Sequence, residues 1–244
     1  PTAIIEMAGA AGITLVPPEL RNPMHTTTYG VGEVIKDAIT KNCRNFIIGI
    51  GGSATNDGGI GMIQALGAEF LDKSGAAGVE KLSAINCENM LSELKDCNFR
   101  IACDVDNPLC GENGCSHIFG PQKGATPELV ERMDVWLNRY AELSRFYNCD
   151  PDYPGSGAAG GLGFAFRTFL HGNLEPGINI VLDEIGIESQ MKTADVVITG
   201  EGRLDGQTVM GKAPIGVAKT AKKYGKPVIG FSGCVTKDAV ACNR

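Results

Sequence analysis

Glycine-framed loops that follow short apolar runs carry the residues best suited to chemistry. The first, GIGGSATNDGG, spans residues 49–59, and its backbone N–H groups could surround an anion at the start of a helix. Its candidate ligand contacts are Gly51, Gly52, Ser53 and Asn56. Asp57 is placed to bind Mg²⁺ or to accept a hydroxyl proton, and the alternative is a glycine-rich turn in which Asp57 caps the helix.

The same loop mimics a dinucleotide-binding fingerprint. Gly49, Gly51 and Ala54 satisfy GxGxxA, and Glu69 follows 20 residues after Gly49. However, residues 56–59 occupy the place where that fold needs the first turns of a packed helix, and a carboxylate there would repel a pyrophosphate. We interpret the match as coincidental, and we keep an NAD(P)-binding oxidoreductase as an alternative function.

Two further segments place charged residues where a ligand could meet them. Asp104 and Asp106 follow a second apolar run, and alternation puts them on one side if the strand continues. Such a pair suits a divalent cation or a general base, although a solvated turn is equally consistent with it. Lys123 lies in a glycine-bounded turn before a helix and could contact a phosphate, the alternative being an ordinary surface lysine.

A later loop, TGEGRLDGQT, brings Glu201, Arg203 and Asp205 into alternation between glycines. The residues that follow match the P-loop spacing GxxxxGK, but they lack the final Ser or Thr that would ligate Mg²⁺. Lys212 is therefore a candidate phosphate contact rather than part of a Walker motif. A glycine-rich, charge-free segment at 154–163 lets a backbone approach a ligand, forms a hinge, or packs closely against a helix.

Together these loops supply anion cradles, strand-end carboxylates and cations, which phosphoryl transfer requires. Backbone amides and cations would bind phosphates, while carboxylates would hold Mg²⁺ and orient the accepting hydroxyl. The candidates for both catalysis and Mg²⁺ ligation, with roles that the residues do not separate, are Asp57, Asp104 and Asp205. The residues thus predict a Mg-dependent phosphotransferase.

Short apolar runs alternate with helical patterns, and this alternation positions the loops. Strands are predicted near 3–5, 46–50, 100–103, 195–199 and 227–231. Helices are predicted near 32–41, 59–66, 126–146, 164–170 and 214–224. In the longest, Thr126 is the expected N-cap and Pro127 lies in the first turn. The pattern indicates an α/β fold with largely parallel sheets flanked by helices, in which ligands bind at the carboxyl ends of the strands.

Composition narrows the class of protein. The 244 residues carry a net charge of −6, which argues against a general binder of nucleic acid or of anionic membranes. No apolar run approaches the roughly 18–20 residues of a membrane span, so we expect a soluble, cytoplasmic protein. The 9 cysteines include no CxxC pair and are expected to be reduced thiols.

Long motifs give the chain a more specific resemblance. Several motifs resemble, in their order along the chain, segments of the bacterial glycerate kinase family of glycerate and glyoxylate catabolism. These motifs are RNPMHTTTYGVGE, GIGGSATNDGG, ACDVDNPL, FGPQKGAT, GAAGGLG and VITGEGRLDGQT with GKAPIGVA. The resemblance implies phosphorylation of D-glycerate with ATP and Mg²⁺, on two α/β domains with the active site in the cleft between them. It favours 2-phosphoglycerate over 3-phosphoglycerate as the product. A non-catalytic nucleotide-binding domain is a second alternative.

The resemblance also implies how the chain is divided. One domain, Rossmann-like and incomplete, is expected to comprise residues 1–30 and 160–244, and the other residues 31–159. Family members begin with a further β-α segment and continue beyond the position of Arg244, so truncation at both ends is expected. Omitted residues are expected between Gly75 and Ala76.

Carried onto this sequence, the resemblance places the loops 51–57 and 201–208 opposite each other across the cleft. Cations would then neutralise the substrate carboxylate or the ATP phosphates, and arginine would be the better carboxylate clamp because its fork binds two oxygens. These cations are Lys123, Arg203 and Lys212. We expect a small-molecule substrate, D-glycerate, with no nucleic acid or membrane as partner, and the sequence leaves a homodimer open.

Overall fold

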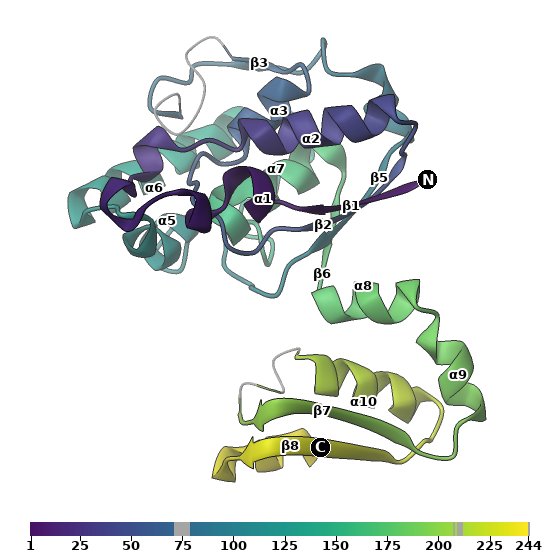
Figure 1. Ribbon diagram of the computed structural model, residues 1–244. Coiled ribbons are helices and arrows are strands. Elements are labelled where there is room, and N and C mark those ends of the chain that lie inside the picture. Colours follow the sequence, from purple (N-terminus) through teal and green to yellow (C-terminus); the bar gives the residue numbers. More distant parts are fainter. Residues whose placement is uncertain (71–78, 207, 209–211, 244) are drawn as a thin grey trace. The chain divides into compact units, whose positions relative to one another are not determined.

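Helices and strands alternate along the chain, which confirms the α/β class predicted from the sequence. The described residues of this computed structural model are 1–70, 79–206, 208 and 212–243. They form two units, residues 1–175 and 176–244, each of which is described by itself (Figure 1). The omission expected between Gly75 and Ala76 lies outside the described residues.

The first unit contains a parallel sheet with its helices, a short antiparallel ribbon and several 3₁₀ helices. Its strands are β1 (Thr2–Glu6), β2 (Asn45–Gly49), β3 (Glu69–Phe70), β4 (Ile85–Asn86), β5 (Asn98–Ala102) and β6 (Asn173–Glu175). Its α-helices are α1 (Ala8–Ala11), α2 (Tyr29–Thr40), α3 (Ile60–Ala65), α5 (Cys115–Phe119), α6 (Pro127–Leu143) and α7 (Ala158–Leu170). Its 3₁₀ helices are η1 (Ile13–Leu15), η2 (Pro18–Leu20), η3 (Pro23–His25), η4 (Ser92–Asp96) and η5 (Pro121–Lys123).

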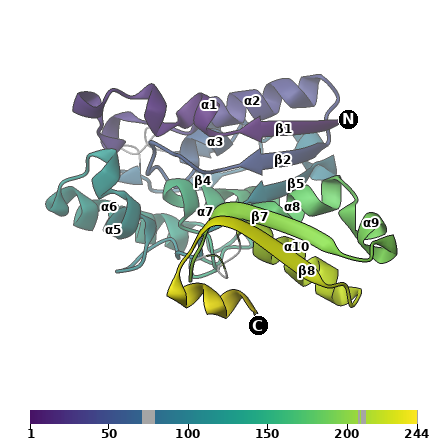
Figure 2. The same ribbon diagram turned by 60° about the horizontal axis from the view of Figure 1, so that its bottom comes forward.

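The main sheet is parallel throughout, with the strand order β1-β2-β5-β6. Figure 2 shows β1, β2 and β5 side by side. Because all four strands run in the same direction, their carboxyl ends lie at one edge, and the loops that leave β2 and β5 are neighbours there. The strands predicted near 3–5, 46–50 and 100–103 are confirmed.

The main core lies between this sheet and helices α2, α3 and α7, which Figure 1 shows on one side of the strands. Alternate strand residues enter it, namely Ile5, Phe46, Ile48, Phe99 and Ile101. Phe46 and Phe99 are register partners, and their rings stack with centroids 4.8 Å apart. Burying each such side chain stabilises the fold by roughly 1.5–3 kcal/mol.

Helix α6 has the start that its sequence predicts. The Oγ1 atom of Thr126 accepts a hydrogen bond from the backbone N–H of Leu129 at 3.3 Å, and Pro127 lies in the first turn. The helix ends at Leu143, before the predicted end at Phe146. Its buried residues include Leu137 and Tyr140, which pack in a second cluster with residues of α3, α5 and α7.

The last strand of the first unit is fixed at its end. β6 pairs with β5 over three residues, and the Glu175 carboxylate accepts hydrogen bonds from Nε and an Nη of Arg100 at 2.8 Å and 2.9 Å. A two-point contact of this kind fixes the orientation of both side chains as well as contributing energy. Pro176 then begins the second unit.

The second unit contains a parallel strand pair, with helices before, between and after its two strands in the sequence. Its elements are α8 (Gly177–Glu184), α9 (Ile187–Thr193), β7 (Val197–Leu204), α10 (Ala213–Lys223), β8 (Val228–Val235) and η7 (Lys237–Asn243). Figure 2 shows β7 and β8 side by side. Met191, Val197 and Ala221 form the small core of this unit.

Strand β7 is longer than predicted. The sequence predicts a strand over 195–199 followed by a glycine-framed loop, but β7 continues to Leu204. The reason is pairing with β8, because Glu201 opposes Ser232 and Arg203 opposes Cys234 in register. Glu201 and Arg203 therefore lie on a strand rather than in a loop.

The division after Glu175 differs from the predicted grouping of residues 1–30 with 160–244 and of 31–159. Residues 2–6 form β1, which pairs with β2 in the same sheet as β5, so the start of the chain belongs to the first unit. Within the described part of the chain, no helix combines the length and apolar character needed to cross a membrane.

Candidate functional site

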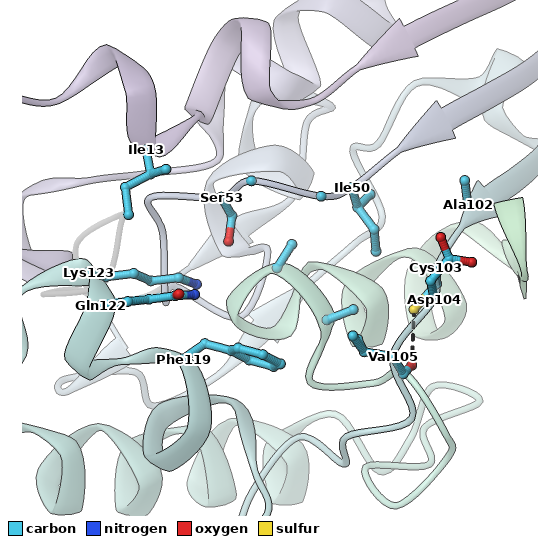
Figure 3. A pocket seen from close by; sticks show the side chains of 14 residues that line it. Ile13, Ile50, Ser53, Ala102, Cys103, Asp104, Val105, Phe119, Gln122 and Lys123 are labelled. Atoms are coloured by element: carbon cyan, nitrogen blue, oxygen red, sulfur yellow. Dashed lines mark hydrogen bonds between the residues drawn. The ribbon is translucent and has the colours of Figure 1, made fainter. Parts of the chain in front are cut away.

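A cavity of about 410 Å³ opens at the carboxyl ends of β2 and β5, where the fold predicts ligand binding (Figure 3). Its walls come from the loops after these strands, from the turn before α6 and from the start of α7. The residues that line it are Ile13, Ile50, Gly51, Gly52, Ser53, Ala102, Cys103, Asp104, Val105, Phe119, Gln122, Lys123, Ala158 and Ala159. The candidate site residues that the structure brings together here are Gly51, Gly52, Ser53, Asp104 and Lys123.

Lys123 is only 2% exposed, and its amine is directed toward the cavity (Figure 3). It ends η5, and Gly124 follows with a φ of 91°, which brings the turn against the carbonyl oxygen of Arg21. The Nζ atom donates a hydrogen bond to the carbonyl oxygen of Thr55 at 2.6 Å. Burial lowers the pKa of Lys123 from 10.5 to about 8, because desolvation disfavours the charged amine. An ammonium group has three donors, so Lys123 can also bind ligand oxygens.

Polar groups lie at two sides of the cavity, with apolar surface between them. In Figure 3 the polar ends of Lys123, Gln122 and Ser53 point into the cavity from one side, and the Asp104 carboxylate lies on the other. The Phe119 ring lies between the two sides. This arrangement suits a small ligand with an anionic group at one end and a hydroxyl group at the other.

Asp57 is fully buried and does not line this cavity. One of its carboxylate oxygens accepts hydrogen bonds from the backbone N–H and hydroxyl of Thr28, at 2.8 Å and 2.9 Å. The hydroxyl of Thr27 and the backbone N–H groups of Gly59 and Gly61 donate to the same carboxylate at 3.1–3.3 Å. With this many donors around it, Asp57 anchors the loop to the segment before α2, and the geometry favours a positioning role over Mg²⁺ ligation or proton transfer.

Asn56 is also buried and lies outside the cavity lining. Its Nδ2 atom donates to the Ser116 hydroxyl at 2.9 Å, which ties the loop to α5. Its Oδ1 atom has no hydrogen-bond partner among the described residues. The contacts of Asn56 are thus contacts within the protein, and its expected role in ligand binding stays a prediction.

Helix α7 begins with consecutive residues in the left-handed region. Ala159, Gly160 and Gly161 have φ values of 53°, 69° and 91°. A Cβ atom at Gly160 would collide with the carbonyl oxygen of Thr55, and one at Gly161 would lie 2.7 Å from Cα of Gly58. The glycines of this segment therefore serve close packing against the loop after β2, while Ala158 and Ala159 face the cavity.

The second unit gathers the other charged candidates around one hydroxyl group. Thr208 Oγ1 donates to Glu201 at 2.7 Å and lies 3.4 Å from Asp205. Asp205 pairs with Arg203 and Lys212, each at 3.4 Å. Gln207 and residues 209–211 of the P-loop-like spacing lie outside the described residues. The cluster combines carboxylates and cations directly before α10.

The described residues do not form a metal cage from protein groups alone, since no three His, Cys, Asp or Glu side chains gather there. Asp57 is engaged by backbone and hydroxyl donors, whereas Asp104 lines the cavity. Mg²⁺ often uses only one or two carboxylates and completes its shell with phosphates and water. Asp104 and the pair of Glu201 and Asp205 fit that limited requirement.

Several residues that line the cavity were not predicted from the sequence. Phe119 and Gln122 lie in the same turn as Lys123, so the FGPQKG motif contains a signal for them. Cys103 lines the wall, and its thiol donates a hydrogen bond to the carbonyl oxygen of Val105 at 3.3 Å. The local spacing does not distinguish this cysteine from a core residue. It lines the cavity because it lies directly after the end of β5.

Comparisons with known proteins show what the chain is similar to. The profile described as "Glycerate kinase family" matches residues 1–244. The chain is 51% identical to a protein named glycerate kinase from Haemophilus influenzae, over 97% of this chain and 65% of that protein. It is 50% identical to glycerate 2-kinase from Escherichia coli, over 97% of this chain and 64% of that protein.

A solved structure is similar as well. The crystal structure of putative glycerate kinase 2 from Salmonella typhimurium superposes with a TM-score of 0.89 and 50% identity. The match covers 98% of this chain and 66% of that chain. This chain thus spans about 65% of the length of curated relatives that it matches.

Proposed function

The chain belongs to the glycerate kinase family, and on this premise we propose that it takes part in the ATP-dependent phosphorylation of D-glycerate. The observation that carries the proposal is the cavity with Lys123 on one side and Asp104 on the other. A small hydroxy acid has the two groups that such a cavity can bind, a carboxylate and a hydroxyl.

The proposed orientation follows from charge. The carboxylate of D-glycerate would bind the Lys123 ammonium, with the Ser53 hydroxyl and the Gln122 amide as further donors. A hydroxyl group would then face Asp104, whose carboxylate is an acceptor. Apolar surface such as the Phe119 ring would separate the two ends and restrict the access of water.

Asp104 is the proposed activating residue of the first unit. During transfer a bond forms between the substrate hydroxyl oxygen and the γ-phosphorus, the bond from that phosphorus to the ADP oxygen breaks, and the hydroxyl proton would pass to the Asp104 carboxylate. Asp104 would orient the hydroxyl by accepting its hydrogen bond, because the loose transition state demands little prior deprotonation. Arg203 and Lys212 are the proposed phosphate contacts of the second unit. Asp104 or Asp205 would hold Mg²⁺, which would supply positive charge to neutralise the transferred group.

We propose 2-phosphoglycerate as the product. The support is the Escherichia coli relative, which is named glycerate 2-kinase and is 50% identical to this chain. The loop after β2 does not support a dinucleotide site, because α3 begins only at Ile60, whereas the fingerprint requires a helix directly after its first glycines.

The test is ADP release from Mg-ATP with and without D-glycerate, on the 244-residue chain. We expect D-glycerate to increase ADP release, and phosphorus NMR should show the phosphate on the 2-hydroxyl. Asp104→Asn should lower turnover by about 100-fold, the scale of losing a positioned acid or base. Asp106→Asn is the matched control, since Asp106 does not line the cavity.

The other outcomes are informative. Binding of D-glycerate and ATP without ADP release would favour a non-catalytic nucleotide-binding domain. An absence of D-glycerate binding, in a folded protein, would reject the proposed substrate. Phosphorylation at the 3-hydroxyl would leave the kinase assignment intact and correct the product.

A further inference from the structure

A second cation lies beside Lys123. Lys123 lines not only the 410 Å³ cavity but also a narrow void, and Arg21 and Asn22 line the same void. Backbone contacts hold the two cationic residues together, because the carbonyl oxygen of Arg21 packs directly against Gly124. The main chain therefore places Arg21 next to Gly124, one residue after Lys123, while the side chains determine where the cationic groups lie.

The void lies between two larger spaces. It shares Ile13 and Lys123 with the 410 Å³ cavity, and it shares Val16, Thr26 and Ala54 with a further cavity of about 160 Å³. The void itself has no room for a water molecule. Arg21 does not line the large cavity, so its side chain has to turn from the void toward Lys123 to reach an anion bound there.

Neither cation has a carboxylate partner in the described part of the chain. The buried Nε atom of Arg21 has no hydrogen-bond partner among the described residues, and Arg21 forms no ion pair with them. Lys123 donates to a neutral acceptor, the carbonyl oxygen of Thr55. A protein that buries part of a guanidinium group without a partner bears an energetic cost, which a bound anion would offset.

We infer that Arg21 is a second oxyanion-binding residue, which together with Lys123 binds a carboxylate or phosphate group of a ligand in the 410 Å³ cavity. Arginine suits this role because its planar fork can donate two parallel hydrogen bonds to one oxyanion. The inference rests on the proposed function, since D-glycerate supplies a carboxylate and ATP supplies phosphates.

The inference can be tested by calorimetric titration. Arg21→Gln and the unchanged chain are each titrated separately with D-glycerate, ATP and inorganic phosphate. We expect Arg21→Gln to weaken one of these ligands by roughly 10- to 100-fold, the scale of losing charge-assisted hydrogen bonds. Arg21→Lys, which keeps the charge but not the fork, should restore part of the affinity. Arg139→Gln is the control, because Arg139 is exposed on α6. Circular dichroism checks that each variant is folded.

Each result decides the matter. A loss confined to D-glycerate identifies the carboxylate as the bound group, and a loss for ATP or phosphate identifies a phosphate. If the unchanged chain binds D-glycerate and ATP and both Arg21 variants bind them equally well, the inference is wrong while the proposed function stands. If the unchanged chain binds none of the three anions, both the inference and the proposed function are rejected.

Discussion

At the scale of single residues, two buried charged groups have different tasks. Asp57 is surrounded by hydroxyl and backbone N–H donors and holds its loop in place. Lys123 donates to one carbonyl acceptor and also lines the 410 Å³ cavity. A buried charge that is fully hydrogen-bonded is a structural element, whereas one beside a cavity is available to a ligand.

The stability contributed by Lys123 should depend on pH. Burial lowers its pKa to about 8 in the folded chain, while 10.5 is the ordinary value expected after unfolding. Between these values the unfolded chain binds more protons, so the free energy of unfolding rises with pH there and falls as pH drops through about 8. The full effect is roughly 3 kcal/mol.

Urea unfolding measures this effect. The unchanged chain and Lys123→Met are compared at pH 7 and at a pH above 10. We expect the unchanged chain to gain stability relative to Lys123→Met as pH rises. The exposed Lys36→Met variant should show a constant difference. A constant difference for Lys123→Met as well would contradict the burial of its amine.

Replacing the Asp57 carboxylate should destabilise the fold. In Asp57→Asn the amide NH₂ would face N–H and hydroxyl donors that now point to a carboxylate oxygen. We expect a loss of about 3 kcal/mol or more in the free energy of unfolding, measured with urea. Asp37→Asn, at an exposed ion pair on α2, should change stability by less than about 1 kcal/mol. Equal effects for the two variants would refute the anchoring role.

At the scale of elements, the start of α7 packs closely against the loop after β2 because Gly160 and Gly161 have no side chains. Gly160→Ala should therefore cost more than the strain of a left-handed alanine, which is about 1–2 kcal/mol. Gly186→Ala isolates that strain, because Gly186 has a similar φ of 62° but open space around its Cα. Thermal unfolding of both variants should show the larger loss for Gly160→Ala, and equal losses would mean that the Thr55 carbonyl yields without cost.

Most of the longer strands and helices could be predicted from the sequence, because apolar runs and helix caps are local signals. Thr126 caps α6 as its type and position require, and the loops after β2 and β5 meet because parallel strands end at one edge. The length of β7 could not be predicted, because its glycines indicate a loop and only pairing with β8 makes them a strand. Pairing between distant segments overrides local preference.

The candidate site could be predicted only in part, for a related reason. Residue type and loop position bring Ser53, Asp104 and Lys123 to one cavity. Spacing does not reveal which way a side chain turns, and Asp57 turns away from the cavity toward the threonines before α2. Arg21 and Lys123 lie in two separate motifs, and the backbone contact that brings them close joins segments far apart in sequence, so the spacing within either motif does not reveal it.

At the scale of the whole molecule, the cavity and the second charged cluster belong to different units. All residues that line the cavity lie within 1–175, whereas Glu201, Asp205 and Lys212 lie within 176–244. The fragment 1–175 should therefore fold alone and bind D-glycerate about as tightly as the full chain, without releasing ADP. Circular dichroism and calorimetric titration of the fragment check this. An unfolded fragment, or a folded one that fails to bind while the full chain binds, would show that the second unit is required.

The paired side chains of Arg100 and Glu175 have a mechanical consequence. The covalent connection between the units leaves the first unit directly after Glu175, so tension transmitted from the second unit enters the sheet through β6. This strand has only three residues in register with β5, and its last residue is the one that the guanidinium binds at two points. The Glu175 carbonyl oxygen also accepts a hydrogen bond from the backbone N–H of Cys103 at 2.9 Å, so the side-chain pair and the main chain share the load at this end of β6.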